Sequence, residues 1–225
     1  MTRAHESALF DIRGVQELRK LVSMGESDHL EFKRKATYPE KIIREMIAFA
    51  NTKGGTLLVG VEDNGAIPGL KHPEEESYAI QSVLHKCKPA LQVQENFIPV
   101  SKSKSVICYT VPESKKKLHY FLSSDGIKES YVRVGDQCIK ASREVREIVR
   151  RSQKSKGIRF HYGEHEHFLI KYLDTNATIT LKKFITLSNL NKYQASKKLI
   201  LLVLANVLRI TPHEKGDLYS LAFSY

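Results

Sequence analysis

Apolar residues recur at helical spacing in several segments of the chain. The clearest segment is 39–52, where Ile42, Ile43, Met46 and Ile47 belong to a broad apolar stripe. Residues 15–22 and 74–86 show the same spacing. Residues 142–151 begin with Ser142 as a helix N-cap and end on two arginines, which suits the helix dipole. These patterns predict four helices.

Other segments have the pattern of β-strands. Residues 56–61 are apolar almost throughout, which predicts a buried central strand. Residues 29–33 alternate between apolar and charged side chains, as a half-buried strand does. Four further strands are expected at 91–100, 105–111, 118–122 and 130–134, each bounded by Pro, Gly or Ser/Lys clusters. Helices and strands mixed in this way predict an α+β fold.

The pattern changes after a polar segment without periodicity. Helices are expected at 164–173, 181–187 and 192–204, followed by strands at 208–212 and 218–223. Three helices followed by a β-hairpin are typical of a winged helix-turn-helix domain. We therefore divide the chain into a lead-in (1–15), an α+β domain (16–151), a linker (152–163) and a small winged-helix-like domain (164–225).

Length and charge favour a nucleic-acid partner. The chain has 225 residues, enough for two domains, and a formal net charge of +11. Residues 1–150 hold 24 Lys and Arg against 20 Asp and Glu, whereas residues 151–225 hold 12 against 5. Residues 151–225, which include the smaller domain, thus carry more than half of the excess.

Compartment and anchoring can also be predicted. No apolar run is long enough to span a bilayer, and residues 1–11 lack the order of a signal peptide. The three cysteines are far apart and form neither a zinc pattern nor a disulfide framework. We expect a cytoplasmic protein without a membrane partner.

Four linked motifs identify a family. They are Gly25–Lys33, with two glutamates before Phe32-Lys33; Ala48–Gly55; Gly60–Gly65; and Tyr131–Gly135 followed by Ala141-Ser142. In this order and spacing they resemble the Schlafen AlbA-like domain family, over roughly residues 16–150. Bacterial members are described as transcriptional regulators or DNA-binding proteins, so the resemblance implies an AlbA-like mixed α/β domain and a nucleic-acid partner.

The resemblance also implies a candidate active site. Eukaryotic Schlafen RNases use a metal and three acidic residues, which match Glu26, Glu31 and Asp63 here. Such carboxylates could hold Mg²⁺ or Mn²⁺, and Lys33 could contact the phosphate. The alternative is that these acids form surface ion pairs with neighbouring cations. Names in the family sometimes mention ATP, but no phosphate-binding loop motif is present, and Gly54-Gly55 is better explained as a turn.

A second candidate site lies in the winged-helix-like domain. The helix at 192–204 would enter the major groove of DNA, with a wing between the last two strands touching the backbone. The expected nucleic-acid-binding residues are Lys192, Tyr193, Gln194, Ser196, Lys197, Lys198, Lys215 and, from the closing motif, Arg133. The alternative is a dimerisation domain, because Leu199–Ala205 is apolar on all sides.

We therefore predict a nucleic-acid-binding protein, specifically a DNA-binding transcriptional regulator that acts on DNA rather than RNA and forms a homodimer. We expect a binding protein rather than an enzyme, with no certain cofactor. The alternatives are a metal-dependent endoribonuclease using Glu26, Glu31 and Asp63, and a dimeric interaction scaffold.

Overall fold

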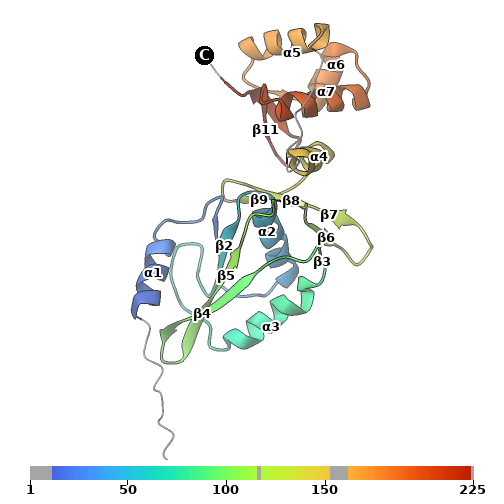
Figure 1. The fold of residues 1–225 in the computed structure, drawn as a ribbon. Helices are drawn as coiled ribbons and strands as arrows, with labels where there is room; N and C mark the ends of the chain where they lie inside the picture. The colour runs from blue at the N-terminus through green and yellow to red at the C-terminus, as the bar shows by residue number, and fades with distance from the viewer. Residues whose placement is uncertain (1–11, 116–117, 153–161, 224–225) are drawn as a thin grey trace, which may run out of the picture.

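A computed structural model describes residues 12–115, 118–152 and 162–223, which form two units (Figure 1). Each unit has its own hydrophobic core. The predicted linker at 152–163 and the lead-in at 1–15 fall largely outside the described residues.

The larger unit, called the AlbA-like unit below, contains four helices and nine strands among its described residues. The helices are α1 (Ile12–Val22), α2 (Pro39–Asn51), α3 (Pro73–Leu84) and α4 (Arg143–Ser152). The strands are β1 (Leu30–Lys33), β2 (Gly55–Val59), β3 (Cys87–Lys88), β4 (Gln94–Ser101), β5 (Lys104–Val111), β6 (Tyr120–Leu122), β7 (Lys128–Glu129), β8 (Tyr131–Val134) and β9 (Gln137–Lys140).

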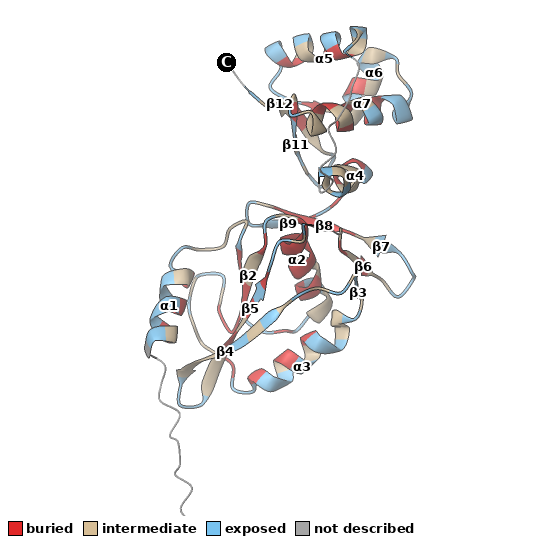
Figure 2. Ribbon diagram, in the orientation of Figure 1, coloured by how far each residue is buried: buried red, intermediate tan, exposed pale blue. Residues whose placement is uncertain are grey.

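A four-stranded sheet in the order β1-β2-β5-β4 forms the centre of this unit. β1 and β2 run parallel, and the other pairs are antiparallel. Side chains alternate between the two faces of a strand. Leu57 and Val59 of β2 accordingly pack with α2 and α3, whereas Leu58 packs with α1 on the other face. Both faces are covered, which explains the continuous apolar run of β2 (Figure 2).

The β8–β9 hairpin packs across α2 and carries the chain from the sheet to α4 (Figure 1). The expected strand at 91–100 begins only at Gln94, and the strand expected at 130–134 is β8. The short strands β3, β7 and β9 were not predicted. They span two to four residues each, too few to show a two-residue period.

The smaller unit, called the C-terminal unit below, follows the predicted order of helices and hairpin. It contains α5 (Glu164–Thr175), β10 (Ile179–Thr180), α6 (Leu181–Ser188), α7 (Lys192–Leu204), β11 (Leu208–Thr211) and β12 (Leu218–Leu221). The strands form a three-stranded antiparallel sheet in the order β10-β12-β11. Its core includes Leu169, Phe184, Leu199 and Tyr219, one from each of the three helices and one from the sheet.

Helix α4 lies between the two units and contacts both (Figure 1). Its Val145 packs with Val132 of β8 and with Ile210 of β11. The Ser142 hydroxyl, just before the helix, donates a 2.6 Å hydrogen bond to Asp217 of the C-terminal unit. None of the helices in the described part of the chain combines the length and apolar character that crossing a bilayer requires.

Candidate nucleic-acid interface

Glu31 occupies the buried face of β1 and is held by two cations. One carboxylate oxygen accepts a 2.9 Å hydrogen bond from Arg133 Nη1, and the other pairs with the Lys33 ammonium. Only 7% of the Glu31 side chain is exposed. Glu31 and Lys33, which were both predicted as catalytic residues, therefore lie together, and they form an ion pair within the folded chain.

Arg133 differs from its sequence-based prediction. Its side chain was expected to contact nucleic acid, but it is fully buried and cannot be reached from the surface. The guanidinium instead pairs with Glu45 at 2.7 Å, donates to the Ser27 carbonyl at 2.6 Å and lies over the Phe49 ring. It neutralises the buried Glu31 and the half-buried Glu45, which would otherwise repel each other. Burial raises the pKa of Glu45, Glu31 raises it further, and Arg133 opposes both.

Glu31 and Asp63 both lie near Glu26. The Glu26 carboxylate accepts a 2.8 Å hydrogen bond from the backbone N–H of Phe32. Burial raises the pKa of Glu26 despite this bond, and the charges of Glu31 and Asp63 raise it further. Asp63 is exposed in the turn that follows β2. Glu26 therefore lies within electrostatic reach of the other two acids that the family resemblance names.

These residues do not fit a metal ion as they stand. In the described ranges no group of three or more His, Cys, Asp and Glu side chains is arranged to hold one. Both oxygens of Glu31 are engaged by Arg133 and Lys33, so coordination would require those ion pairs to break. We therefore derive no step through Mg²⁺ or Mn²⁺.

Gly54 and Gly55 are explained by packing. Gly54 has a positive φ of 75°, and a Cβ there would lie 2.8 Å from the Val111 carbonyl oxygen. A Cβ on Gly55 would lie 2.3 Å from the Phe49 ring. Atoms of the protein itself fill the space beside these glycines. This agrees with their interpretation as a turn and gives no support to an ATP site.

Several predicted contact residues of α7 are engaged within the C-terminal unit or with α4. Gln194 forms a capping box with Asn191 at the start of the helix. Lys198 pairs with the buried Glu166 of α5 at 2.5 Å. The Ser196 hydroxyl is buried and donates a 2.6 Å hydrogen bond to Glu144 of α4. Ser196 is therefore not on the open surface that its predicted role requires.

The remaining predicted residues are exposed and lie on two sides of the C-terminal unit. Lys192 and Lys215 line a cleft of about 840 Å³ between this unit and the β8–β9 hairpin. Tyr193 and Lys197 instead line a groove between α4 and α7. This second feature, called the α4–α7 groove below, has a volume of about 470 Å³.

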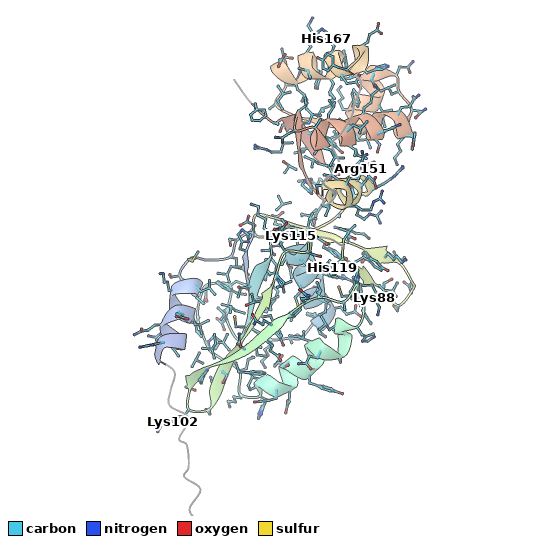
Figure 3. The ribbon with its side chains drawn as sticks, in the orientation of Figure 1. Lys88, Lys102, Lys115, His119, Arg151 and His167 are labelled. Atoms are coloured by element: carbon cyan, nitrogen blue, oxygen red, sulfur yellow. The ribbon has the colours of Figure 1, made fainter. Side chains whose placement is uncertain are left out.

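The α4–α7 groove is strongly basic. Four arginines of α4 and one lysine of α7 line it, with one carboxylate: Arg143, Arg146, Arg150, Arg151, Lys197 and Glu147. Tyr193, Leu118, Ser196 and Ile200 complete the lining. Arg151 lies on α4 at the level between the two units (Figure 3). A concave surface with this charge focuses a positive potential, which attracts a polyanion.

Two contacts hold groove side chains in place. Arg150 forms a bidentate pair with Glu147, at 2.8 Å from Nη2 to both carboxylate oxygens. The Arg143 guanidinium lies 5.9 Å from the centroid of the Tyr193 ring, which is 60% exposed. The helix dipole accounted for Arg150 and Arg151 in the sequence but gave Arg143 and Arg146 no role. The spacing at 143, 146 and 150 puts these arginines on one helical face and was the signal available.

Comparison with known proteins identifies the family. Residues 26–142 match the family described as Schlafen, AlbA_2, which is slightly more than half of the chain. The chain belongs to this family, as its motifs indicated, and membership points to a role in nucleic-acid binding.

The comparison with solved structures gives one distant likeness. The chain is similar to the DIP2311 protein from Corynebacterium diphtheriae at 20% identity, with a TM-score of 0.43. The similarity covers 64% of this chain and 29% of that one, so the chain spans under a third of its length. A likeness this distant carries no information on function.

Proposed function

We propose that the protein binds DNA through the α4–α7 groove and acts as a transcriptional regulator. The observation that carries the proposal is the charge of the groove, where five cations face one carboxylate. Arginine forks match the geometry of phosphate oxygens, and clusters of them bind the nucleic-acid backbone. Family membership supports the same class of partner.

The form of the C-terminal unit supports a DNA-binding role. A helix, a short strand, two helices and a hairpin with a three-stranded sheet are the parts of a winged helix. The predicted wing, between β11 and β12, carries His213 and Lys215 at its exposed tip. These observations favour the regulator over an interaction scaffold, which has no need for a basic groove.

The test is a binding titration with groove arginines removed. We expect Arg146→Ala with Arg150→Ala to weaken binding of a fluorescent oligonucleotide, presented as single strand and as duplex, by about tenfold or more. Fluorescence anisotropy at low salt measures the affinity.

The matched control removes the same charge elsewhere. Lys171 on α5 and Lys183 on α6 are exposed and do not line the groove. Their double alanine variant keeps the affinity of the unmodified protein if the groove is the binding site. Equal losses in both double variants would show that only net charge matters. If the unmodified protein binds no oligonucleotide, the interaction scaffold becomes the remaining candidate function.

A metal-dependent nuclease is the second candidate, favoured by the mutual proximity of Glu26, Glu31 and Asp63. Incubation of structured RNA with Mn²⁺ tests it. Asp63→Asn is the most informative variant because Asp63 is exposed and its replacement spares the buried ion pairs. Cleavage that persists in both Asp63→Asn and Glu31→Ala would eliminate this assignment.

The apolar run of α7, which suggested a homodimer, is only partly covered within one chain, because Leu201, Val203 and Leu204 are half-buried. Leu199, Ile200 and Leu202 of that run are buried within one chain, by the core of the C-terminal unit and by α4. Sedimentation equilibrium of the full chain measures the oligomeric state directly.

A further inference from the structure

Helix α4 covers part of the face of α7 that a double helix would contact. Ala195, Leu199 and Leu202 face the core of the C-terminal unit. Tyr193, Lys197 and Ile200 point away from that core by the helical period, and they line the groove against α4. Ile200 is only 6% exposed, so the middle of this outward face is already occupied.

With α4 in this place, α7 cannot enter the major groove of a double helix. The major groove of B-DNA is about 12 Å wide and admits one α-helix. Two packed helices have axes about 8–10 Å apart and are together wider than that groove. The buried hydrogen bond between Ser196 and Glu144 joins α4 to α7 at this place. Insertion of α7 into duplex DNA would therefore require α4 to leave.

A single strand meets no such obstacle. Proteins that bind single strands combine a basic groove, which follows the phosphates, with aromatic side chains on which bases stack. The α4–α7 groove has both parts. Its arginines lie along α4, and the Tyr193 ring is 60% exposed beside the Arg143 guanidinium.

We propose that the α4–α7 groove binds single-stranded nucleic acid, with phosphates on the α4 arginines and a base stacked on Tyr193. This inference rests on the proposed nucleic-acid-binding function and specifies its substrate. Stacking and phosphate contacts are shared by DNA and RNA, so both are included among the ligands tested.

The experiment measures fluorescence anisotropy of the full chain with labelled oligonucleotides of about 12 nucleotides, within the length that single-strand-binding domains cover. The ligands are single-stranded DNA, single-stranded RNA of the same sequence, and the DNA duplex. We expect single-stranded DNA or RNA to bind about tenfold more tightly than the duplex, because duplex bases are not available for stacking.

Three tyrosine variants test the stacking contact. Tyr193→Ala should weaken single-strand binding about tenfold, whereas Tyr193→Phe keeps the ring and should retain the affinity. Tyr78→Ala is the matched control, because Tyr78 is an exposed tyrosine on α3, outside the groove. Tyr193 is exposed, so none of these effects requires a change in folding.

The outcomes separate this inference from the proposed function. A duplex that binds as tightly as the single strands, or full affinity in Tyr193→Ala, would overturn the single-strand inference and leave nucleic-acid binding standing. No binding to any of the three ligands at low salt would overturn both. We expect the preference for single strands to be lost in Tyr193→Ala and kept in Tyr193→Phe.

Discussion

At the scale of single residues, Arg133 has the largest structural role among the side chains of the candidate sites. It is fully buried and pairs with two carboxylates, Glu31 from β1 and Glu45 from α2. A buried charge is tolerated only when it is paired, so removal of this one cation would leave two acids facing each other. Arg133 thus holds together strand β1, helix α2 and the β8–β9 hairpin.

We expect Arg133→Ala to lower the free energy of unfolding by about 3–5 kcal/mol, the usual cost of breaking a buried pair. Urea denaturation at neutral pH measures it. Arg34→Ala is the control, because Arg34 pairs with Glu62 at the surface. Its replacement should lower the free energy of unfolding by less than about 1 kcal/mol. Equal effects of the two substitutions would contradict the assigned role of Arg133.

The same variant has a defined dependence on pH. Glu45 has a raised pKa in the folded protein, and loss of Arg133 would raise it further. An acid with a raised folded pKa stabilises the fold below its unfolded value, near 4.5, and this stability is lost as the pH rises through the folded pKa. The stability difference between Arg133→Ala and the unmodified protein should therefore narrow as the pH falls toward 4.5.

The sequence could propose a set of acids but could not predict what holds each of them. The family motifs led to Glu26, Glu31 and Asp63, and in the structure the charges of the other two raise the pKa of Glu26. The partnership of Glu31 with Arg133 joins positions 102 residues apart, and no local pattern reports it. Arg133 was instead predicted to bind nucleic acid, because the pairing that buries it cannot be read from its local sequence.

At the scale of elements, periodicity predicted the long helices and strands, because each buries one side on a core. Helix α2 and strand β2 were expected from their apolar patterns and form the centre of the AlbA-like unit. The face of α7 that each side chain occupies was harder to predict. Ser196 and Lys198 lie in the same helical turn as Lys197, yet one faces α4 and the other α5.

Neighbouring lysines of α7 should consequently behave differently when replaced. Lys197→Ala should weaken nucleic-acid binding about fivefold and leave stability unchanged, because Lys197 is exposed in the groove. Lys198→Ala should leave binding unchanged and lower the free energy of unfolding by about 1–3 kcal/mol, because the buried Glu166 would lose its partner.

Anisotropy titrations and urea denaturation of both variants check these two expectations. Lys171→Ala is the control, since Lys171 is an exposed lysine of α5 outside the groove and should change neither quantity. Loss of affinity in Lys198→Ala without loss of stability would mean that α7 presents a different face to the ligand.

At the scale of the whole molecule, the arrangement of charge matters more than its total. The net charge of +11 indicated a polyanion partner, and more than half of the excess falls in residues 151–225, which include the smaller domain. Four of the five groove cations come from α4, which precedes that domain in sequence. The groove exists only because α4 and α7, some 40 residues apart, pack together, and so it could not be predicted from local composition.

Salt dependence distinguishes a localised site from diffuse attraction. Five phosphate contacts on a single strand predict a slope of about −3.5 for log K against log salt concentration, since each contact contributes about −0.7. The Arg146→Ala, Arg150→Ala variant should show a slope shallower by about 1.4, whereas alanine at Lys171 and Lys183 should leave the slope unchanged. Titrations between low and moderate salt measure all three. A slope steeper than about −6 would mean that phosphates also contact the basic surface outside the groove. The two arginines would then account for only a small share of the contacts, and the groove would not define the binding site.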